Sequence, residues 1–364
     1  MKQWKQIGGV MTKKEKNLVT SALVVILIAA AFLLTSYIIA NRVIIPSVGG
    51  EYTEGLVGEP QYINPLYTSI NDVDTDLSRL IYSGLLKWDE EKGYIGDLAD
   101  KIEIDEEKTT YTITLKENAK FHDGESVRAR DVLFTLSAIQ NPAYRSPLAA
   151  NFQSATISQV DDLTVEFTLK KPLAKFEQFL TLGILPAHVW SDILPQNAPL
   201  AALNLQPIGS GPYQFSSFAK DKKGFIRSYT LKRNESYFGE EPKIELLNFK
   251  FYPDAGSAMQ ALTNKNVEGV SVVPFEEIES AKNNRSIKLV QPFIPQKMVL
   301  IFNRKSGTEL SKHTLRTAVS RGIDKKDLVE NVLHEKARVI KGPILENKVG
   351  YHDSLETPSF DKKK

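Results

Sequence analysis

The stretch TTYTITLKENAKFHDGESVRARDVLFTLSAI, residues 109–139, contains the patterns of a strand, a turn and a helix in immediate succession. In Thr110–Leu115 apolar side chains alternate with threonines, which predicts a half-buried strand. Asp123-Gly124 predicts a turn, because glycine adopts a positive φ without steric cost. From Asp131 onward the apolar residues recur at helical spacing, which predicts an amphipathic helix.

The patterns on either side of this block indicate more strands paired as hairpins. One hairpin is predicted over Lys101–Leu115, turning at Asp105–Lys108, and a second over Thr156–Leu169, turning at Asp161-Asp162. A helix is predicted over Asp76–Leu86 from its apolar face. Together these patterns predict a mixed α/β (α+β) fold with antiparallel parts, not a simple βαβ alternation.

Length and composition exclude several classes of protein. A chain of 364 residues exceeds one comfortable hydrophobic core, so at least two domains are expected. Five of the 46 lysines and arginines and one of the 44 acidic residues lie in the first 41 positions, so the remainder is slightly acidic. A nucleic-acid partner is therefore not expected. The absence of cysteine excludes disulfides, a thiol nucleophile and a lipidated N-terminal cysteine.

The N-terminal region predicts a membrane anchor. Leu18–Ala40 is uncharged and apolar, and as a helix it would span about 35 Å, enough for the hydrocarbon core of a bilayer. Lys13, Lys14 and Lys16 lie directly before it and only Arg42 lies directly after it, so the positive-inside rule places segment 1–17 in the cytoplasm and the bulk of the chain outside. Residues 41–57 are predicted as a linker leading into a first strand.

Two other interpretations of the apolar segment remain open. A buried core helix is disfavoured by the uncharged length and the preceding lysines. A cleaved signal peptide is the stronger alternative, although the apolar run is long for one. In addition, Ser36–Ala40 (SYIIA) lacks the small residue at position −3 that cleavage normally needs. An uncleaved, single-pass anchor is the preferred interpretation.

No motif predicts catalysis, a metal site or a cofactor. The five histidines show no metal-ligand spacing, and His122 in the turn is interpreted as a structural histidine with satisfied hydrogen bonds. Gly209-Ser210-Gly211 matches neither a P-loop nor a nucleophile elbow. The acidic runs Asp105–Glu107 and Asp161-Asp162 are interpreted as solvated hairpin tips, not as paired catalytic carboxylates.

Seven ordered blocks over residues 58–345 resemble the family 5 extracellular solute-binding proteins, the oligopeptide- and dipeptide-binding class that serves ABC importers. The opening block TLKENAKFHDGESVRARDVLFTL resembles the signature of that family. The other blocks are similar to further family segments in the same order; they are Gly58-Glu59-Pro60 with Asn64-Pro65-Leu66, Ile81–Leu86 with Leu98-Ala99, Ile208–Tyr213, Arg233–Phe238, Ile301–Asn303 as a strand, and Leu315–Val319 with Gly322-Ile323-Asp324.

The resemblance implies a two-lobe clamp of the periplasmic-binding-protein type (type II). The first lobe would comprise residues 58–88 and 206–273, with an inserted subdomain at 89–205. The second lobe would begin at 274 and be incomplete at 364, because family members continue well beyond the last matching block. Ligand binding would close the two lobes about a hinge.

The resemblance also implies a ligand and partners. The expected ligand is an oligopeptide or another small solute, and the expected partners are the permease subunits of an ABC transporter. Relatives take peptides, nickel, haem or sugars, so the ligand class stays open. By position in the resemblance, the expected ligand-binding residues are Ser69, Ile70, Asn71, Ser271, Val272, Val273, Phe293 and Gln296. Plain packing is the alternative for each of them, above all for the two valines and Phe293.

Two other functions compete with transport. A receptor-like module could sense a ligand without an importer, and permease genes nearby or a co-purifying permease would separate the two. A surface hydrolase is the third possibility, but no nucleophile with an adjacent base supports it. The protein is therefore expected to be a binding protein and not an enzyme.

Overall fold

The computed structural model describes residues 12–41, 47–68, 71–290, 297–305, 307–345, 351–355 and 359–361. The chain divides into two compact units, Met1–Glu279 and Ser280–Lys364. The boundaries of the proposed lobes stay a prediction, because the division into units does not test them.

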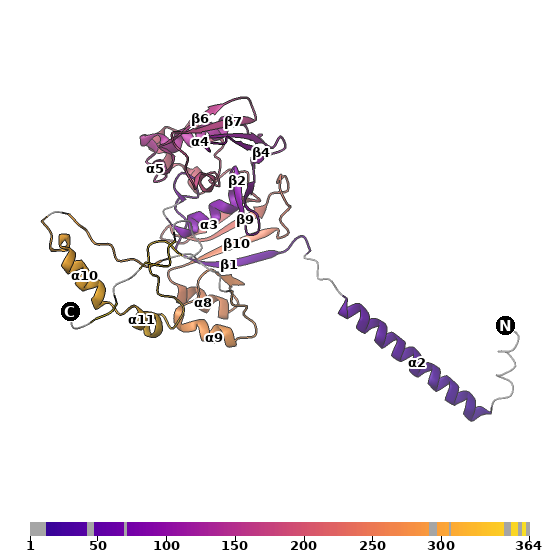
Figure 1. Cartoon of the computed structure of the whole chain (residues 1–364). Coiled ribbons are helices and arrows are strands. Elements are labelled where there is room, and N and C mark those ends of the chain that lie inside the picture. Colours follow the sequence, from indigo (N-terminus) through magenta and orange to yellow (C-terminus); the bar gives the residue numbers. More distant parts are fainter. Residues whose placement is uncertain are drawn as a thin grey trace. The chain divides into compact units, whose positions relative to one another are not determined.

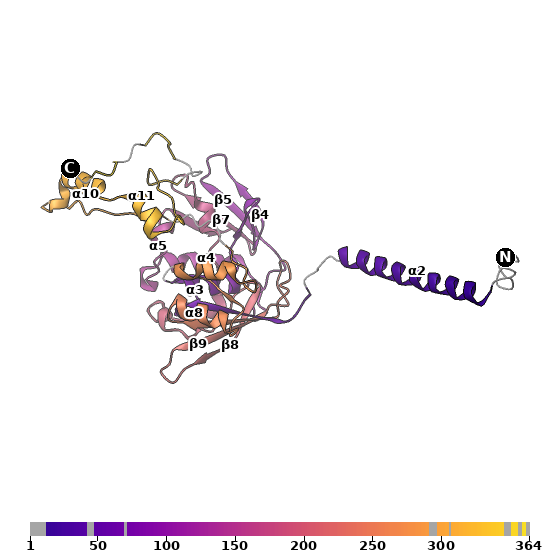
Figure 2. The ribbon, with the colours of Figure 1, turned by 90° about the horizontal axis from the view of Figure 1, so that it is seen from below.

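The apolar N-terminal segment is a single helix, α2, over Lys13–Ala40 (Figures 1 and 2). It begins before the predicted apolar run because Thr12 and Glu15 form a capping box: the Thr12 hydroxyl accepts from the Glu15 N–H and the Glu15 carboxylate accepts from the Thr12 N–H. The most apolar stretch of 18 residues in α2 has a mean hydropathy of 2.7, and 0% of this stretch is buried. By length and composition α2 can cross a membrane.

A five-stranded sheet in the order β11-β1-β10-β9-β8 forms the centre of the first unit. Its strands are β1 (Glu51–Val57), β8 (Tyr213–Lys220), β9 (Ile226–Arg233), β10 (Leu246–Tyr252) and β11 (Gly269–Val270). Strand β1 is parallel to β10 and β11, and the other pairs are antiparallel. Strand β1 occupies the last seven residues of the region predicted as linker leading into a strand. Helices α3 (Asp72–Ile81) and α8 (Ala255–Thr263) cover opposite faces of the sheet (Figure 1).

The block 109–139 folds as predicted within a second, four-stranded sheet in the order β4-β5-β7-β6. Both predicted hairpins are present; their strands are β4 (Ala99–Ile104) with β5 (Thr110–Leu115), and β6 (Ala155–Gln159) with β7 (Thr164–Leu169). The predicted helix is α4 (Ala129–Gln140). Alternate side chains of β5 are buried. A short hairpin, β2 (Leu86–Asp89) with β3 (Gly93–Gly96), precedes this sheet.

Short helices connect the larger elements of the first unit. They are η2 (Pro142–Tyr144), α5 (Ala149–Phe152), α6 (Phe176–Phe179), α7 (Ala187–Trp190), η3 (Pro195–Leu200), η4 (Ala202–Asn204) and η5 (Phe275–Glu277), followed by α9 (Ile278–Asn283).

The helix predicted over Asp76–Leu86 is wrong at both ends. The structure has it as α3, which begins at Asp72 because Asn71 caps it, and which ends at Ile81. Beyond that point Gly84 forms an antiparallel bridge with Gly183. A Cβ at Gly84 would lie 2.6 Å from the carbonyl oxygen of Thr181, so the chain is extended and closely packed there instead of helical.

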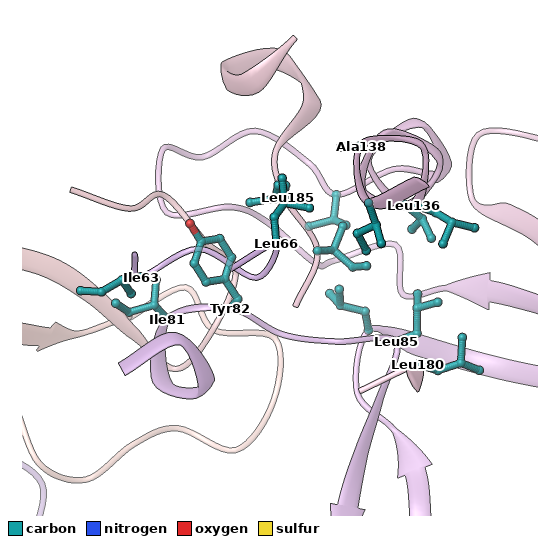
Figure 3. Packing of buried hydrophobic residues seen from close by; sticks show 14 of the residues in the cluster. Ile63, Leu66, Ile81, Tyr82, Leu85, Leu136, Ala138, Leu180 and Leu185 are labelled. Atoms are coloured by element: carbon teal, nitrogen blue, oxygen red, sulfur yellow. The ribbon is translucent and has the colours of Figure 1, made fainter. Parts of the chain in front are cut away.

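One continuous hydrophobic cluster joins the two larger sheets. Figure 3 shows the place where the end of α3 meets α4 and the neighbouring loops; the labelled side chains are Ile63, Leu66, Ile81, Tyr82, Leu85, Leu136, Ala138, Leu180 and Leu185. Buried residues of the segment predicted as an inserted subdomain thus belong to the same cluster as those of the first sheet, and its boundaries stay a prediction.

The described part of the second unit contains helices and no strand. Its helices are η6 (Glu309–Ser311), α10 (His313–Gly322), α11 (Lys325–Asp327) and a π-helical turn over Leu328–Val332. The predicted strand at Ile301–Asn303 is wrong for this structure. Met298 and Ile301 are 89% and 84% exposed, and a strand forms only where another strand pairs with it.

Candidate ligand-binding edge of the sheet

The carboxyl ends of three parallel strands lie together at one end of the five-stranded sheet. This end of the sheet is called the candidate edge. Strand β1 is parallel to β10 and β11, so Val57, Tyr252 and Val270 lie at the same edge. In open α/β sheets, ligands bind in the crevice outside the carboxyl ends of such strands. Helix α8 follows β10 directly from this edge, where the Asp254 carboxylate accepts from the Ser257 N–H at 2.8 Å.

A buried aspartate holds the loop that follows β1 against α3. Asp74 is 0% exposed and accepts from the backbone N–H groups of Gln61 and Tyr62 at 2.8 and 2.9 Å. Burial raises the pKa of its carboxyl group, and these hydrogen bonds oppose the rise. Sequence reasoning missed Asp74. The sequence contained a sign of its burial, because Asp74 precedes the apolar Leu77 and Ile81 at the spacing that places all three on one face of a helix.

Asn71 occupies the N-cap of α3, and both of its polar side-chain atoms have partners. Its Oδ1 accepts from the Asp74 N–H at 2.7 Å, and its Nδ2 donates to the Asp74 carboxylate at 2.7 Å. A Cβ at Gly58 would lie 3.6 Å from Val73, which places this helix terminus beside the end of β1. Asn71 therefore has a structural role at the candidate edge. Ser69 and Ile70 lie outside the described residues.

The change Asn71→Ala is expected to lower the free energy of unfolding by about 1 to 2 kcal/mol, because the first turn of α3 loses its cap. Asn71→Ser retains a capping oxygen and should cost much less. Thermal unfolding of both variants checks this. Equal losses for the two would contradict capping, and a loss of ligand affinity in the serine variant, which keeps the cap, would indicate that Asn71 also contacts ligand.

The segment Ser271–Val273 leaves the sheet next to β1. The Ser271 N–H donates to the Gly55 carbonyl oxygen at 3.3 Å. Val272 is 51% exposed, so it is not a buried core residue in this structure. Asn71 and Ser271 thus lie in segments that adjoin the same edge, whereas Phe293 and Gln296 fall outside the described residues. Ligand contact by any of the eight expected residues stays a prediction.

Carboxylates that sequence reasoning missed line the β1–β11 border. The Tyr52 hydroxyl donates to Glu54 at 2.5 Å, and the Thr53 N–H donates to Glu268 at 2.9 Å. Burial is the main cause of a raised pKa at Glu54; the hydrogen bond from Tyr52 opposes the rise, and the nearby Asp76 adds to it. A Cβ at Gly269 would overlap this tyrosine–glutamate pair. The signal was a glutamate two residues after Tyr52 in a strand, a spacing that places both side chains on the same face of the sheet.

His122 has the structural role that the sequence predicted. Its Nδ1 accepts from the Gly209 N–H at 3.2 Å, and its Nε2 lies 3.1 Å from the Gly211 carbonyl oxygen. This pattern requires the neutral tautomer with hydrogen on Nε2. Burial lowers the pKa of His122 to about 4. The hairpin tips are likewise structural: the exposed Asp105 and Asp161 carboxylates accept backbone N–H groups of their own turns.

Within the described ranges, no three His, Cys, Asp or Glu side chains are placed so that they could share a metal ion. Tyr52, Glu54 and Glu268 lie toward the amino end of β1, so the candidate edge itself offers mainly backbone groups. Such groups can accept or donate hydrogen bonds to a polar solute.

Comparison with known proteins gives the family context. Residues 93–364 match the family model of the bacterial extracellular solute-binding proteins, family 5 middle region. The chain is 28% identical over 328 residues to the oligopeptide-binding protein AppA of Bacillus subtilis (strain 168); the match covers 87% of this chain and 58% of that protein.

Two solved structures are similar at 26% identity and a TM-score of 0.74 each. One is AppA from Bacillus subtilis in complex with a nonapeptide, with coverage of 88% of this chain and 63% of that chain. The other is NikZ from Campylobacter jejuni in complex with Ni(L-His), with coverage of 85% and 60%. The chain thus spans about 60% of the length of the relatives that it matches.

Proposed function

Because this chain belongs to the bacterial extracellular solute-binding proteins of family 5, we propose that it captures oligopeptides between two lobes and delivers them to the permease of an ABC importer. The family and its periplasmic-binding-protein fold confirm the resemblance seen in the sequence. The family is one of binding proteins, so the expectation of a binder and not an enzyme is also confirmed.

The observation that carries the peptide proposal is the similarity to AppA in both sequence and structure. That protein is named for oligopeptide binding, and its similar structure contains a nonapeptide. A nickel–histidine complex is the second candidate ligand, because the NikZ structure matches with the same TM-score and contains Ni(L-His). A receptor-like module without a transport role remains the alternative function.

The proposed ligand contacts are the segments 69–71 and 271–273, with Phe293 and Gln296. A peptide backbone in an extended conformation would add hydrogen bonds of the kind that a sheet edge makes, and water-filled pockets would accept different side chains. Ser271 supports this proposal because it adjoins β1 at the carboxyl edge of the sheet. Low selectivity for peptide sequence follows from recognition through the main chain.

We further propose that α2 stays in the mature protein as a membrane anchor with its N-terminus in the cytoplasm. The capped, uninterrupted helix and the lysines at its start support this orientation. The intact mass of the chain recovered from membranes tests it. When these 364 residues are expressed, a mass near 40.7 kDa is expected, whereas removal of α2 as a signal peptide would give a smaller product.

Peptide capture is tested by native mass spectrometry of the full chain in lipid nanodiscs, mixed with a pool of peptides of two to ten residues. Saturable complexes with intact peptides are expected, and no peptide should be cleaved. Ni(L-His) in a parallel sample tests the second candidate. Failure of the pool to bind while Ni(L-His) binds would replace the first ligand by the second, and cleavage of any peptide would contradict a pure binding function.

A further inference from the structure

The β8–β9 hairpin differs in charge from the other hairpins of the first unit. Its tip, residues 219–227 with the sequence AKDKKGFIR, contains four basic residues and one acidic residue. The tips of the other three hairpins contain runs of acidic residues; these are Asp89–Glu91, Asp105–Glu107 and Asp161-Asp162. The chain beyond the anchor is slightly acidic overall, so the basic tip is a local exception.

The one acidic residue of the tip, Asp221, forms hydrogen bonds and an ion pair within the turn. The Asp221 carboxylate accepts from the N–H groups of Lys223 and Phe225 at 2.8 and 3.1 Å. It also pairs with the Arg227 guanidinium at 2.6 Å. Lys220, Lys222 and Lys223 are exposed and keep the tip positively charged.

An aromatic side chain projects among these cations. Phe225 is 47% exposed, and the Arg227 guanidinium carbon lies 5.6 Å from its ring centroid. The tip also extends past the rest of the sheet, because β10 pairs with β9 only as far as Ser228. Lysines around an exposed aromatic ring form the combination that binds at the interface of an anionic bilayer, where the ring enters the headgroup region and the cations meet the phosphates.

We propose that residues 219–227 form a docking tip for anionic lipid headgroups of the membrane in which α2 is anchored. This inference rests on the proposal that α2 is retained. The ten positions 41–50 between α2 and β1 reach about 33 to 36 Å when extended, whereas the seven-residue β1 is about 23 Å long. The tether therefore lets the sheet lie along the membrane, and it keeps the tip at a high local concentration there.

The chain contains no cysteine, so a single spin label reports on the tip without background. Ala219→Cys places a nitroxide beside the tip while all four basic residues and Phe225 remain. Glu106→Cys is the matched control on an acidic hairpin tip of the same unit. Both labelled full-length chains are placed in nanodiscs of phosphatidylcholine alone or mixed equally with phosphatidylglycerol, and the accessibility of each label to water-soluble nickel chelate is measured.

In the anionic discs the label at 219 should be protected, and the label at 106 should stay accessible. Phosphatidylcholine discs or 0.5 M salt should abolish the protection. The double change Lys222→Gln and Lys223→Gln should lower the ratio of bound to free tip about tenfold or more, and Phe225→Ser should lower it as well. These variants lie in an exposed turn, so their folding is preserved.

Equal accessibility at 219 and 106 in anionic discs would overturn the proposal. Undiminished protection in phosphatidylcholine, or in the variant with Lys222→Gln and Lys223→Gln, would overturn it too, because such protection would not be electrostatic. Protection that appears only after an acidic protein is added would assign the tip to a protein partner instead. If the chain does not co-purify with the discs, the anchor proposal fails and the docking tip fails with it.

Discussion

The change Gly209→Ala is expected to lower the free energy of unfolding by about 3 to 5 kcal/mol. This loss is larger than the one expected for Asn71→Ala. A Cβ at this position would overlap the carbonyl oxygen of Ile81, which is the last residue of α3. The obstacle is backbone and not a flexible side chain, so it cannot move without shifting the end of the helix.

The turn 209–212, the end of α3 and His122 are joined by backbone hydrogen bonds, and this contact is called the joint. A displaced backbone would also break these hydrogen bonds. The Gly211 N–H donates to the same Ile81 carbonyl at 2.8 Å, and the Gly209 carbonyl accepts from the His122 N–H at 2.8 Å. Each bond lost inside the core leaves a buried polar group without a partner. Their loss adds to the steric cost and explains why the expected effect exceeds that of ordinary overpacking.

Urea unfolding of the full chain in detergent, followed by tryptophan fluorescence, measures the effect. Gly224→Ala is the matched control: this glycine has φ +92° and nothing within 4 Å of a built Cβ, so alanine there is strained but does not overlap other atoms. The control should cost about 1 to 2 kcal/mol. A loss at Gly209 no larger than that of the control would show that the joint can relax, contrary to the expectation.

The contacts around Gly209 join several of the sequence blocks that resemble the family. The turn 209–212 meets His122 from the opening block, Ile81 from the end of α3, and Asn234, whose Nδ2 donates to the Gly211 carbonyl at 3.0 Å. These residues belong to four of the blocks that resemble the family. Four segments that are far apart in the sequence therefore meet at this one joint.

Local patterns predicted the elements that local forces determine. The hairpins β4–β5 and β6–β7 and helix α4 follow from alternation, turn residues and helical spacing. The end of α3 was predicted wrongly because Gly84 is extended by its contact with Thr181, a residue distant in sequence. The strand at 301–303 was predicted wrongly because pairing depends on a partner and not on its own pattern.

The candidate edge was less predictable than the fold. Ser271–Val273 was placed by the resemblance, and the structure puts it beside β1 at the carboxyl edge. Asp74 and Glu54 were missed because a carboxylate on an otherwise apolar face is visible only once the element and its register are known. A polar residue on an apolar face interrupts the hydrophobic pattern, so the pattern marks the position but does not show whether the residue is buried or which groups it binds.

His122 is expected to make the stability of this chain depend on pH between about 7 and 4. Burial lowers its pKa to about 4 in the folded protein, against an ordinary value of 6.5 in the unfolded chain. Between these two values the unfolded state binds a proton that the folded state does not, so stability falls as the pH falls. The contribution is fully present above pH 6.5 and is lost as the pH approaches 4.

The main physical cause of this dependence is burial of the ring, and the hydrogen bond from Gly209 acts in the same direction, whereas the bond to the Gly211 carbonyl favours the protonated ring. Protonation would place a hydrogen on Nδ1, which faces the Gly209 N–H donor at 3.2 Å. Two donors would then oppose each other inside the joint. Among the neighbouring charges, Asp123 favours the protonated ring and Lys232 disfavours it, and burial outweighs both.

The loss of stability from pH 7 to pH 4.5 due to His122 should be about 2 to 3 kcal/mol. Burial raises the pKa of Asp74, Asp97 and Asp131, and these groups act in the opposite direction, so the total for the protein is smaller. The decisive quantity is therefore the difference between the unmodified chain and His122→Asn, whose amide does not titrate. Urea unfolding at both pH values measures it. The variant should start less stable at pH 7 and lose about 2 to 3 kcal/mol less on acidification; parallel losses in the two proteins would show that this histidine is not the titrating group.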